Sequence, residues 1–416
     1  MVSPPPIPPW AVPVTAWTLL QSLTGLTATL TLASSPLRYL AAATTALIAY
    51  IFQTSMQTHF AGTRPSGPLV AMCWVNVLNA FDLLLFTRAS YDGLVAYLRT
   101  KDEKKHDNTR KQTPESDSLR AKTVFAIMLP YNYRRIGTPW QISRLPIFTF
   151  PSIPTSRLYF YLYSIAELTI AMALINALTL PPDNTNLLLA LKKLNTSKSV
   201  LLLPLRVLTG QSPFYYLWLQ ARFTLSFGII TRAAISASYT AGALVAVSLG
   251  AKPAEWPPIA GSLGQAWTLQ RLWGYSWHQT LRRPLSATAT FLSSLLGFKP
   301  TSPGAHWIRV IFAFVGSGIV HAACDMGFGI PFERSGGVAY FSLQILGLVL
   351  ESVFQNMIAR FGLSANGLFA RVVGYIWVCA FLLWSTPVWI NPILVNIVKD
   401  GVNGMSPWLG FRPGSF

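Results

Sequence analysis

Two histidines stand where they could do chemistry. His278 directly follows the aromatic stretch that runs from Trp273 to Trp277, and His321 lies inside the apolar run 308–326. An ionisable side chain at bilayer depth is costly unless it faces a protein cavity with partners, so it marks a functional site by default. An imidazole can take or release a proton near neutral pH. The two histidines therefore point to an enzyme.

Small and acidic residues surround His321 at helical spacing. Ser317 and Gly318 precede it by four and three residues, and Asp325 follows it by four. On a helix these positions share one face, so Asp325 could accept from one ring nitrogen while the other nitrogen faces the cavity. Ser317 and Gly318 are small enough to leave space above the ring. The alternative is a structural histidine that joins helices by hydrogen bonds, with Asp325 at the membrane interface.

The aromatic stretch before His278 has helical spacing too. Trp273 and Trp277 are four residues apart, so one helical turn would place two aromatic walls beside the imidazole. Arg282 and Arg283 lie one turn further, and the same helix could hold an anionic, adenine-bearing cofactor by charge and stacking. The alternative is an interfacial amphipathic helix, in which tryptophan lies at headgroup depth and arginine reaches the phosphates.

Composition places the whole chain in a membrane. Hydrophobic residues make up 52% of its 416 residues and charged residues 11%, and long apolar runs recur from end to end. The formal net charge of +18 comes from basic residues crowded into a few polar segments, which excludes a nucleic-acid-binding face. The three cysteines lie inside apolar segments without the spacing of a metal site or a disulfide framework, so we expect no metal.

The apolar runs predict an all-α, polytopic bundle of eight or nine transmembrane helices, with interfacial amphipathic helices around a central cavity. The run 214–249 is either one long tilted helix or two helices broken near Arg232. The first run lacks a basic start and is longer than a secretory signal, so we expect a membrane helix there. The predicted spans are 10–33, 39–53, 68–86, 158–180, 214–249, 308–326, 338–358 and 369–395.

The chain divides into N-terminal transmembrane helices (1–97), a polar loop (98–123) and a membrane core (124–416). Residues 99–122 have no apolar periodicity and are rich in charge, so we expect a mobile loop, on the cytosolic side because of its basic residues. Segment 181–212 is basic but also holds the sequon at Asn195, so its side of the membrane stays open. Its short apolar pieces, 187–191 and 200–205, are typical of interfacial amphipathic turns.

Four motifs occur in order along the chain. The motifs are Arg135-Ile136-Gly137-Thr138-Pro139-Trp140-Gln141, then Trp256-Pro257-Pro258, then Trp273-Gly274 through Trp277-His278-Gln279, and Ser317-Gly318 with His321. Together they resemble the fungal wax-synthase-like branch of the membrane-bound O-acyltransferase superfamily, with a signature region at 134–325.

The resemblance implies that His321 is the catalytic base and that His278 is the second active-site residue, an asparagine in many relatives. The chain departs from the family in two places. Tyr275 and Ser276 replace two basic residues, which puts phosphate contacts of that turn in doubt, and Ala322 replaces an acidic residue. The residues we expect to hold the acyl-CoA co-substrate are Trp273, Trp277, Gln279, Arg282 and Arg283.

The expected activity is acyl transfer from acyl-CoA, chiefly acetyl-CoA, to a hydroxyl of a lipophilic secondary metabolite such as a terpenoid or meroterpenoid. The alternative is a long-chain wax-ester synthase. We expect no permanently bound cofactor, a multi-pass location in the endoplasmic reticulum, and contacts with membrane lipids but not with nucleic acid.

Two other classes fit less well. A prenyltransferase or terpene cyclase needs two acidic clusters to hold magnesium, and only Asn79 with Asp82 could form one. A transporter would be expected to show inverted, broken half-helices, which the sequence lacks. Glu167 and Glu351 are expected as hydrogen-bonding partners between helices, with contact to the acceptor as the alternative.

Overall fold

The computed structural model describes residues 8–63, 65–103, 118–178, 200–360 and 367–399, and these residues are helical apart from turns, loops and one isolated β-bridge. The chain forms two compact units. Unit 1 comprises Met1–Ala61, Ser66–Ser143 and Thr280–Gly316, and unit 2 comprises Gly62–Pro65, Arg144–Gln279 and Ser317–Phe416. Both predicted active-site histidines, His278 and His321, belong to unit 2.

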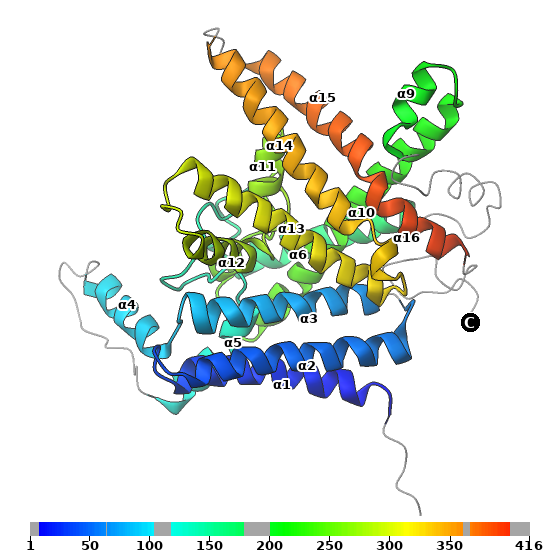
Figure 1. The fold of residues 1–416 in the computed structure, drawn as a ribbon. Coiled ribbons are helices and arrows are strands. Elements are labelled where there is room, and N and C mark those ends of the chain that lie inside the picture. The colour runs from blue at the N-terminus through cyan, green and yellow to red at the C-terminus, as the bar shows by residue number, and fades with distance from the viewer. Residues whose placement is uncertain (1–7, 64, 104–117, 179–199, 361–366, 400–416) are drawn as a thin grey trace, which may run out of the picture. The chain divides into compact units, whose positions relative to one another are not determined.

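In unit 1 the first three helices lie side by side (Figure 1). Small residues let the helices approach closely, as in other membrane bundles. A Cβ atom on Gly25 would lie 1.9 Å from the carbonyl oxygen of Ala126, so only glycine fits where α1 meets α5. The helices of unit 1 are α1 (Ala11–Leu30), α2 (Leu37–Phe60), α3 (Ser66–Phe81), the π-helix η1 (Asp82–Phe86), α4 (Tyr91–Glu103), α5 (Leu119–Tyr131), α12 (Arg282–Leu295) and the first part of α13 (Pro303–Gly327).

Unit 2 is built from long apolar helices that pack α6 against α10, and α14 against α15 and α16. A loop region between α10 and α12 carries short helices and the β-bridge. The elements of unit 2 are α6 (Arg157–Leu178), α9 (Leu203–Leu208), α10 (Phe214–Ser248), η2 (Pro253–Glu255), η3 (Leu263–Gln265), α11 (Leu269–Arg271), the π-helix η4 (Leu272–Ser276), the second part of α13, η5 (Phe332–Arg334), α14 (Gly337–Arg360), α15 (Leu368–Ser385) and α16 (Pro387–Lys399).

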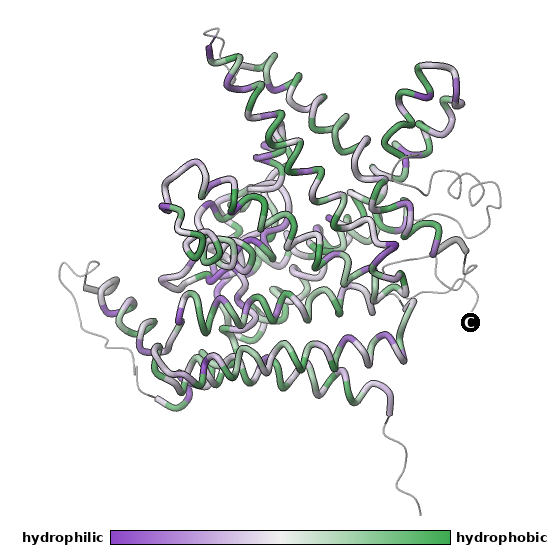
Figure 2. Tube along the Cα trace, in the orientation of Figure 1, coloured by the Kyte–Doolittle hydropathy of each residue, from purple (hydrophilic) through white to green (hydrophobic). Residues whose placement is uncertain are grey.

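Among the described residues, six helices are long and apolar enough to cross a membrane. Hydrophobic residues dominate these helices in Figure 2, for example along α3 and α15. The all-helical, multi-span class is therefore confirmed, while the count of eight or nine and the central cavity stay predictions. The six are Ser66–Phe86, Arg157–Leu178, Phe214–Ser248, Pro303–Gly327, Gly337–Arg360 and Leu368–Ser385; the predicted spans at α1 and α2 form helices but are not among them.

The structure decides one open alternative and moves two boundaries. The stretch after Phe214 is one continuous helix, which is the first of the two alternatives, and Arg232 does not break α10. The predicted span 369–395 is two helices, because α15 ends at Ser385 and Pro387, which cannot donate a backbone hydrogen bond, begins α16. The polar loop predicted at 98–123 is helical at both ends: α4 runs to Glu103, and the Ser118 side chain caps α5 by accepting from the backbone N–H of Ala121.

Two other predicted features lie at least partly outside the described residues. Residues 104–117 of the predicted polar loop and the sequon at Asn195 lie outside the described part of the chain. The apolar piece predicted at 200–205 leads into the six-residue helix α9, which is too short to span a bilayer.

Candidate active site

The backbone of its own helix orients His321. The Nδ1 atom of His321 lies 2.7 Å from the carbonyl oxygen of Ser317, one turn earlier on α13. A carbonyl oxygen can only accept, so Nδ1 carries the proton in this contact and Nε2 carries the free lone pair. Nε2 is therefore the atom that can act as a base, and the bond to Ser317 keeps the ring in that tautomer.

Asp325 does not take the place expected for it beside the His321 ring. Its carboxylate accepts from Ser335 Oγ at 2.6 Å and from Trp389 Nε1 at 3.1 Å, although Asp325 shares the helix of His321. The Trp389 ring in turn lies 4.9 Å from the imidazole, edge to face. Asp325 thus holds one wall of the His321 site, and the Ser317 carbonyl makes the contact with the imidazole that was one of the two alternatives for Asp325.

Gly318 also differs from its expected role. A Cβ atom there would lie 2.8 Å from Cα of Val338, so Gly318 lets α13 pack closely against the start of α14. It does not open space above the imidazole. Phe341, on α14, covers the ring instead, with 4.5 Å between the ring centroids.

His278 lies on a short extended segment rather than on a helix. The π-helix η4 ends at Ser276, and His278 pairs with Ala260 in an antiparallel β-bridge. Its neighbour Gln279 donates its backbone N–H to Ile259 at 3.0 Å. The prediction of one helix running from the tryptophans to Arg282 is therefore wrong, because the chain is extended at Trp277 and α12 begins anew at Arg282.

The imidazole of His278 is held neutral by its surroundings. Burial, with smaller contributions from the nearby His321 and Arg232, lowers the pKa of His278 to about 3. Nδ1 is buried with no partner among the described residues, while the side chain as a whole is partly exposed. The nitrogen that remains accessible to a substrate is consequently Nε2.

An aromatic wall joins the two histidines. The ring centroids of His278 and Trp277 are 5.9 Å apart, and those of Trp277 and Trp273 are 5.8 Å apart. Trp273 lies 6.0 Å from Phe341, which packs on His321. The predicted pairing of two tryptophans with an imidazole is thus present, although the second tryptophan ends the helical turn.

Arg232 is a site residue that the sequence analysis missed. From the middle of α10 its guanidinium donates to the carbonyl oxygens of Ser276 and Gly261, the latter at 2.8 Å. These two carbonyls belong to the two strands whose bridge carries His278. The sequence did contain a signal, because Arg232 lies in the middle of an apolar span. A charged side chain there is costly unless it forms hydrogen bonds inside the protein.

The two intramembrane glutamates have structural partners. Glu351, on α14, accepts from the backbone N–H of Leu269 at 2.7 Å, so it caps the helix that leads to Trp273. Glu167, on α6, accepts from Thr240 of α10 at 2.8 Å. Both fit the expected role of partners between elements.

In unit 1, Arg283 is committed to a buried ionic cluster. Asp82 accepts from Arg135 at 2.8 Å and from Arg283 at 3.1 Å, and Arg135 and Asp82 are fully buried. Burial lowers the pKa of Arg135, and the charge of Asp82 opposes that shift. This cluster gives the Arg135 motif a structural role. It also removes Arg283 from the set free to bind phosphates and occupies the acidic group on which the prenyltransferase alternative depended.

Gln279 and Arg282, the other two polar residues expected to hold acyl-CoA, have different surroundings. Gln279 is buried and donates from Nε2 to the carbonyl of Arg144 at 3.1 Å, while its Oε1 has no partner among the described residues. Arg282 opens α12 in unit 1, beside the committed Arg283.

Comparisons with known proteins place a family match over this region. Residues 256–343, which hold the β-bridge, the aromatic wall and both histidines, match the Membrane bound O-acyl transferase family. No solved structure matches the chain significantly. The resemblance inferred from the four motifs is confirmed, and with it the class of enzyme to which the chain is similar, the membrane-bound acyltransferases.

The similar proteins include fungal acetyltransferases. Acetyltransferase spyB of Aspergillus fumigatus is 26% identical over 80% of this chain and 57% of the relative. Acetyltransferase ataH of Aspergillus terreus is 34% identical over 41% of the chain and 57% of the relative. Acetyltransferase fsoF of Humicola fuscoatra is 27% identical over 70% of the chain and 72% of the relative. The chain thus covers little more than half the length of two of these relatives.

Proposed function

We propose that this protein is an acyl-CoA-dependent O-acyltransferase of the endoplasmic reticulum membrane, and that it acetylates a hydroxyl of a lipophilic secondary metabolite such as a terpenoid or meroterpenoid. The observation that carries the proposal is the contact between His321 Nδ1 and the Ser317 carbonyl, which leaves Nε2 as a base at membrane depth. The neutral His278 at the other end of the aromatic wall supplies a donor.

The reaction follows from these two roles. His321 Nε2 takes the proton of the acceptor hydroxyl as its oxygen attacks the thioester carbonyl. Nε2–H of His278 donates to the oxygen on which negative charge develops. The tetrahedral intermediate then expels the CoA thiolate, which takes up the proton from His321, so the products are the ester and free CoA.

The acetyl donor is proposed from the names of the relatives, which are acetyltransferases, and the secondary-metabolite acceptor from the resemblance to the fungal branch. A long-chain wax-ester synthase would use the same two histidines with a longer acyl chain. Rates with acetyl-, octanoyl- and palmitoyl-CoA at equal concentration separate the two activities. The proposal expects acetyl-CoA to be preferred, and a clear preference for palmitoyl-CoA would favour the wax-ester alternative.

The test is His321→Ala in microsomes supplied with radiolabelled acetyl-CoA and extracts of fungal metabolites. Loss of a general base lowers kcat by about 10²–10⁴-fold. His306→Ala is the matched control, because His306 is an exposed histidine on the same helix, α13. The proposed role of His321 is rejected if its alanine variant keeps more than about a tenth of the wild-type kcat while expression stays normal.

A further inference from the structure

Two arginines share one tryptophan ring in unit 2. The guanidinium carbon of Arg271 lies 4.0 Å from the ring centroid of Trp267, and that of Arg371 lies 4.6 Å from it. The two positive charges are therefore no farther apart than the sum of these distances. Like charges this close repel each other, so their shared position favours an anion between or beside them.

The ring that carries both arginines is rigidly placed. Trp267 is only 5% exposed, whereas Arg271 and Arg371 are exposed. A Cβ on Gly374 would lie 2.2 Å from the Trp267 carbonyl oxygen, so the backbone of α15 presses directly on this residue. Arg271 also donates to Gln265 at 3.1 Å, and neither arginine forms an ion pair within the described part of the chain.

The backbone just before Arg271 and the ring of His321 contact α14 at different heights. Phe341 of α14 packs on His321, and Glu351 of α14 binds the backbone of Leu269 and Gln270, next to Arg271. Ten residues of α-helix separate these two positions, a rise of about 15 Å. That is the order of the reach of an extended pantetheine arm from the thioester to the diphosphate of CoA.

We propose that Arg271, Arg371 and Trp267 form an arginine clamp that binds the phosphate groups of the acyl-CoA donor. This inference rests on the proposed function and names the part of the same site that recognises the nucleotide end of the donor. Arginine suits this task because its planar fork binds phosphate oxygens in pairs. The clamp takes over the contacts that Arg283 cannot make while it is bound to Asp82.

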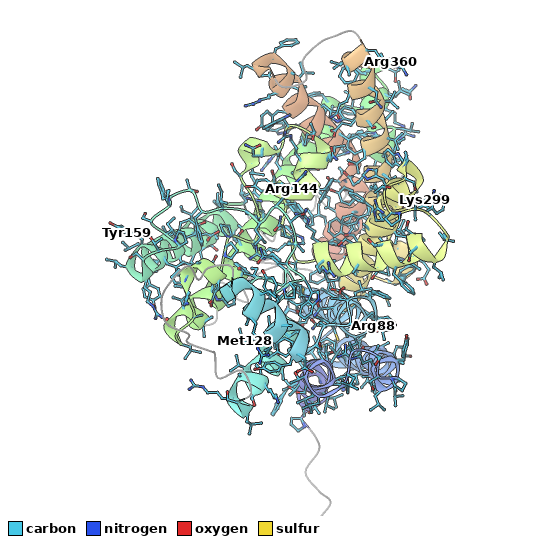
Figure 3. All side chains as sticks on the ribbon, turned by 90° about the vertical axis from the view of Figure 1, so that its left-hand side faces the viewer. Arg88, Met128, Arg144, Tyr159, Lys299 and Arg360 are labelled. Carbon is cyan, nitrogen blue, oxygen red and sulfur yellow. The ribbon has the colours of Figure 1, made fainter. Side chains whose placement is uncertain are left out.

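Phosphates of lipid headgroups have the same chemistry as those of CoA. The end of α14 carries another basic residue, Arg360, which Figure 3 shows at the tip of that helix. A general attraction to lipid would involve all such exposed arginines equally. The clamp differs because two guanidiniums are fixed on one buried ring, so CoA is the ligand to which we commit.

The experiment compares two donors that differ only in the nucleotide end. Acetyl-CoA carries the phosphates, and S-acetylpantetheine lacks them. For Arg271→Met, Arg371→Met and the double variant, we expect the KM for acetyl-CoA to rise by about tenfold or more per arginine, as loss of a charge-assisted bond does. The KM for S-acetylpantetheine and both kcat values should stay within about twofold of the wild type. Arg222→Met, an exposed arginine on α10, is the control and should change neither.

Equal effects of the clamp variants on both donors would overturn the inference and indicate a structural role. An unchanged KM for acetyl-CoA, with activity that follows the anionic lipid content of nanodiscs, would overturn it in favour of lipid binding.

Equilibrium binding of tritiated CoA to the purified protein separates this inference from the proposed function, because it needs no acceptor. Wild-type binding that the double variant loses supports the clamp, even if no acetyl transfer is found. Wild-type acetyl transfer with unchanged CoA binding in the double variant overturns the clamp alone. Absence of CoA binding by the wild type overturns both.

Discussion

The two histidines are held in different ways, and the difference matches the two tasks proposed for them. His321 has Nδ1 fixed on a backbone carbonyl, which defines its tautomer and exposes a lone pair at Nε2. His278 has no hydrogen-bond partner at Nδ1 among the described residues, and burial keeps the ring uncharged. A base needs a free lone pair, and an oxyanion donor needs an N–H, which the neutral ring still has on one nitrogen.

Replacing His278 tests which of its nitrogens donates. Glutamine places its amide near the position of Nε2, asparagine near that of Nδ1, and leucine donates nothing. We expect His278→Leu to lose about 10²-fold or more in kcat, as deletion of an oxyanion donor does elsewhere. The glutamine variant should retain the most activity, and acyl-CoA binding should be normal in all three. Equal kcat values for glutamine and leucine would mean that His278 only packs against Trp277.

The neutral state of His278 also predicts how stability depends on pH. Its pKa is about 3 in the folded protein, against an ordinary value of 6.5. Because the unfolded chain takes up the proton first, the stabilising contribution is complete above pH 6.5 and is lost as the pH falls towards 3. The melting temperature of the wild type in detergent should therefore drop more between pH 7 and pH 4.5 than that of His278→Gln. Parallel curves would contradict the lowered pKa.

At the scale of elements, a membrane helix supports the loop that carries His278. Isolated bridges are weak, since each backbone hydrogen bond contributes only about 1 kcal/mol. Arg232 adds a charge-assisted donor to each of the two strands, at Gly261 and Ser276. The position of His278 therefore depends on a side chain 46 residues earlier in the chain.

Arg232→Met should release this loop. We expect a fall in kcat of about tenfold or more, because misplacement of a catalytic group costs rate even when binding survives. Amide hydrogen exchange should become faster at Gly261 and Gln279, whose N–H groups donate between the two segments, to Tyr275 and Ile259. Arg222→Met, on the same helix, is the control. Wild-type exchange rates in Arg232→Met would show that the bridge holds without the arginine.

The buried cluster of Asp82, Arg135 and Arg283 predicts a stability effect in unit 1. Asp82→Asn leaves two arginines without their counter-charge, which costs about 3–5 kcal/mol for a buried pair. The melting temperature in detergent should fall by roughly 6 °C or more. Asp92→Asn, an exposed aspartate on α4, should have little effect. A neutral result for Asp82→Asn would mean that water reaches the cluster.

At the scale of the whole molecule, the charge distribution predicts the topology. If segment 99–122 is cytosolic, protease added to sealed microsomes should cut there without detergent. Glycosylation at Asn195 would place segment 181–212 in the lumen. Since CoA is supplied from the cytosol, a luminal position of Arg271, detected by a membrane-impermeant probe on a cysteine at that site, would contradict the arginine clamp.

The sequence alone determined the membrane class and the positions of most helices, and it singled out the two histidines as candidate active-site residues. Apolar runs of about 20 residues are a local property, because each must satisfy its own backbone in lipid. The motif order around His278 and His321 is local too. These features could be predicted without knowing which helices touch.

The tertiary structure decided the partners. Asp325 and Ser317 lie on one helical face with His321, but only packing shows that Asp325 binds Trp389 and that the Ser317 carbonyl binds the imidazole. Arg283 looked free beside His278 in the sequence, yet it binds Asp82, 201 residues away. Such contacts depend on long-range packing and on the requirement that each buried charge find a counter-charge or hydrogen-bond partners, and neither is visible in residue spacing.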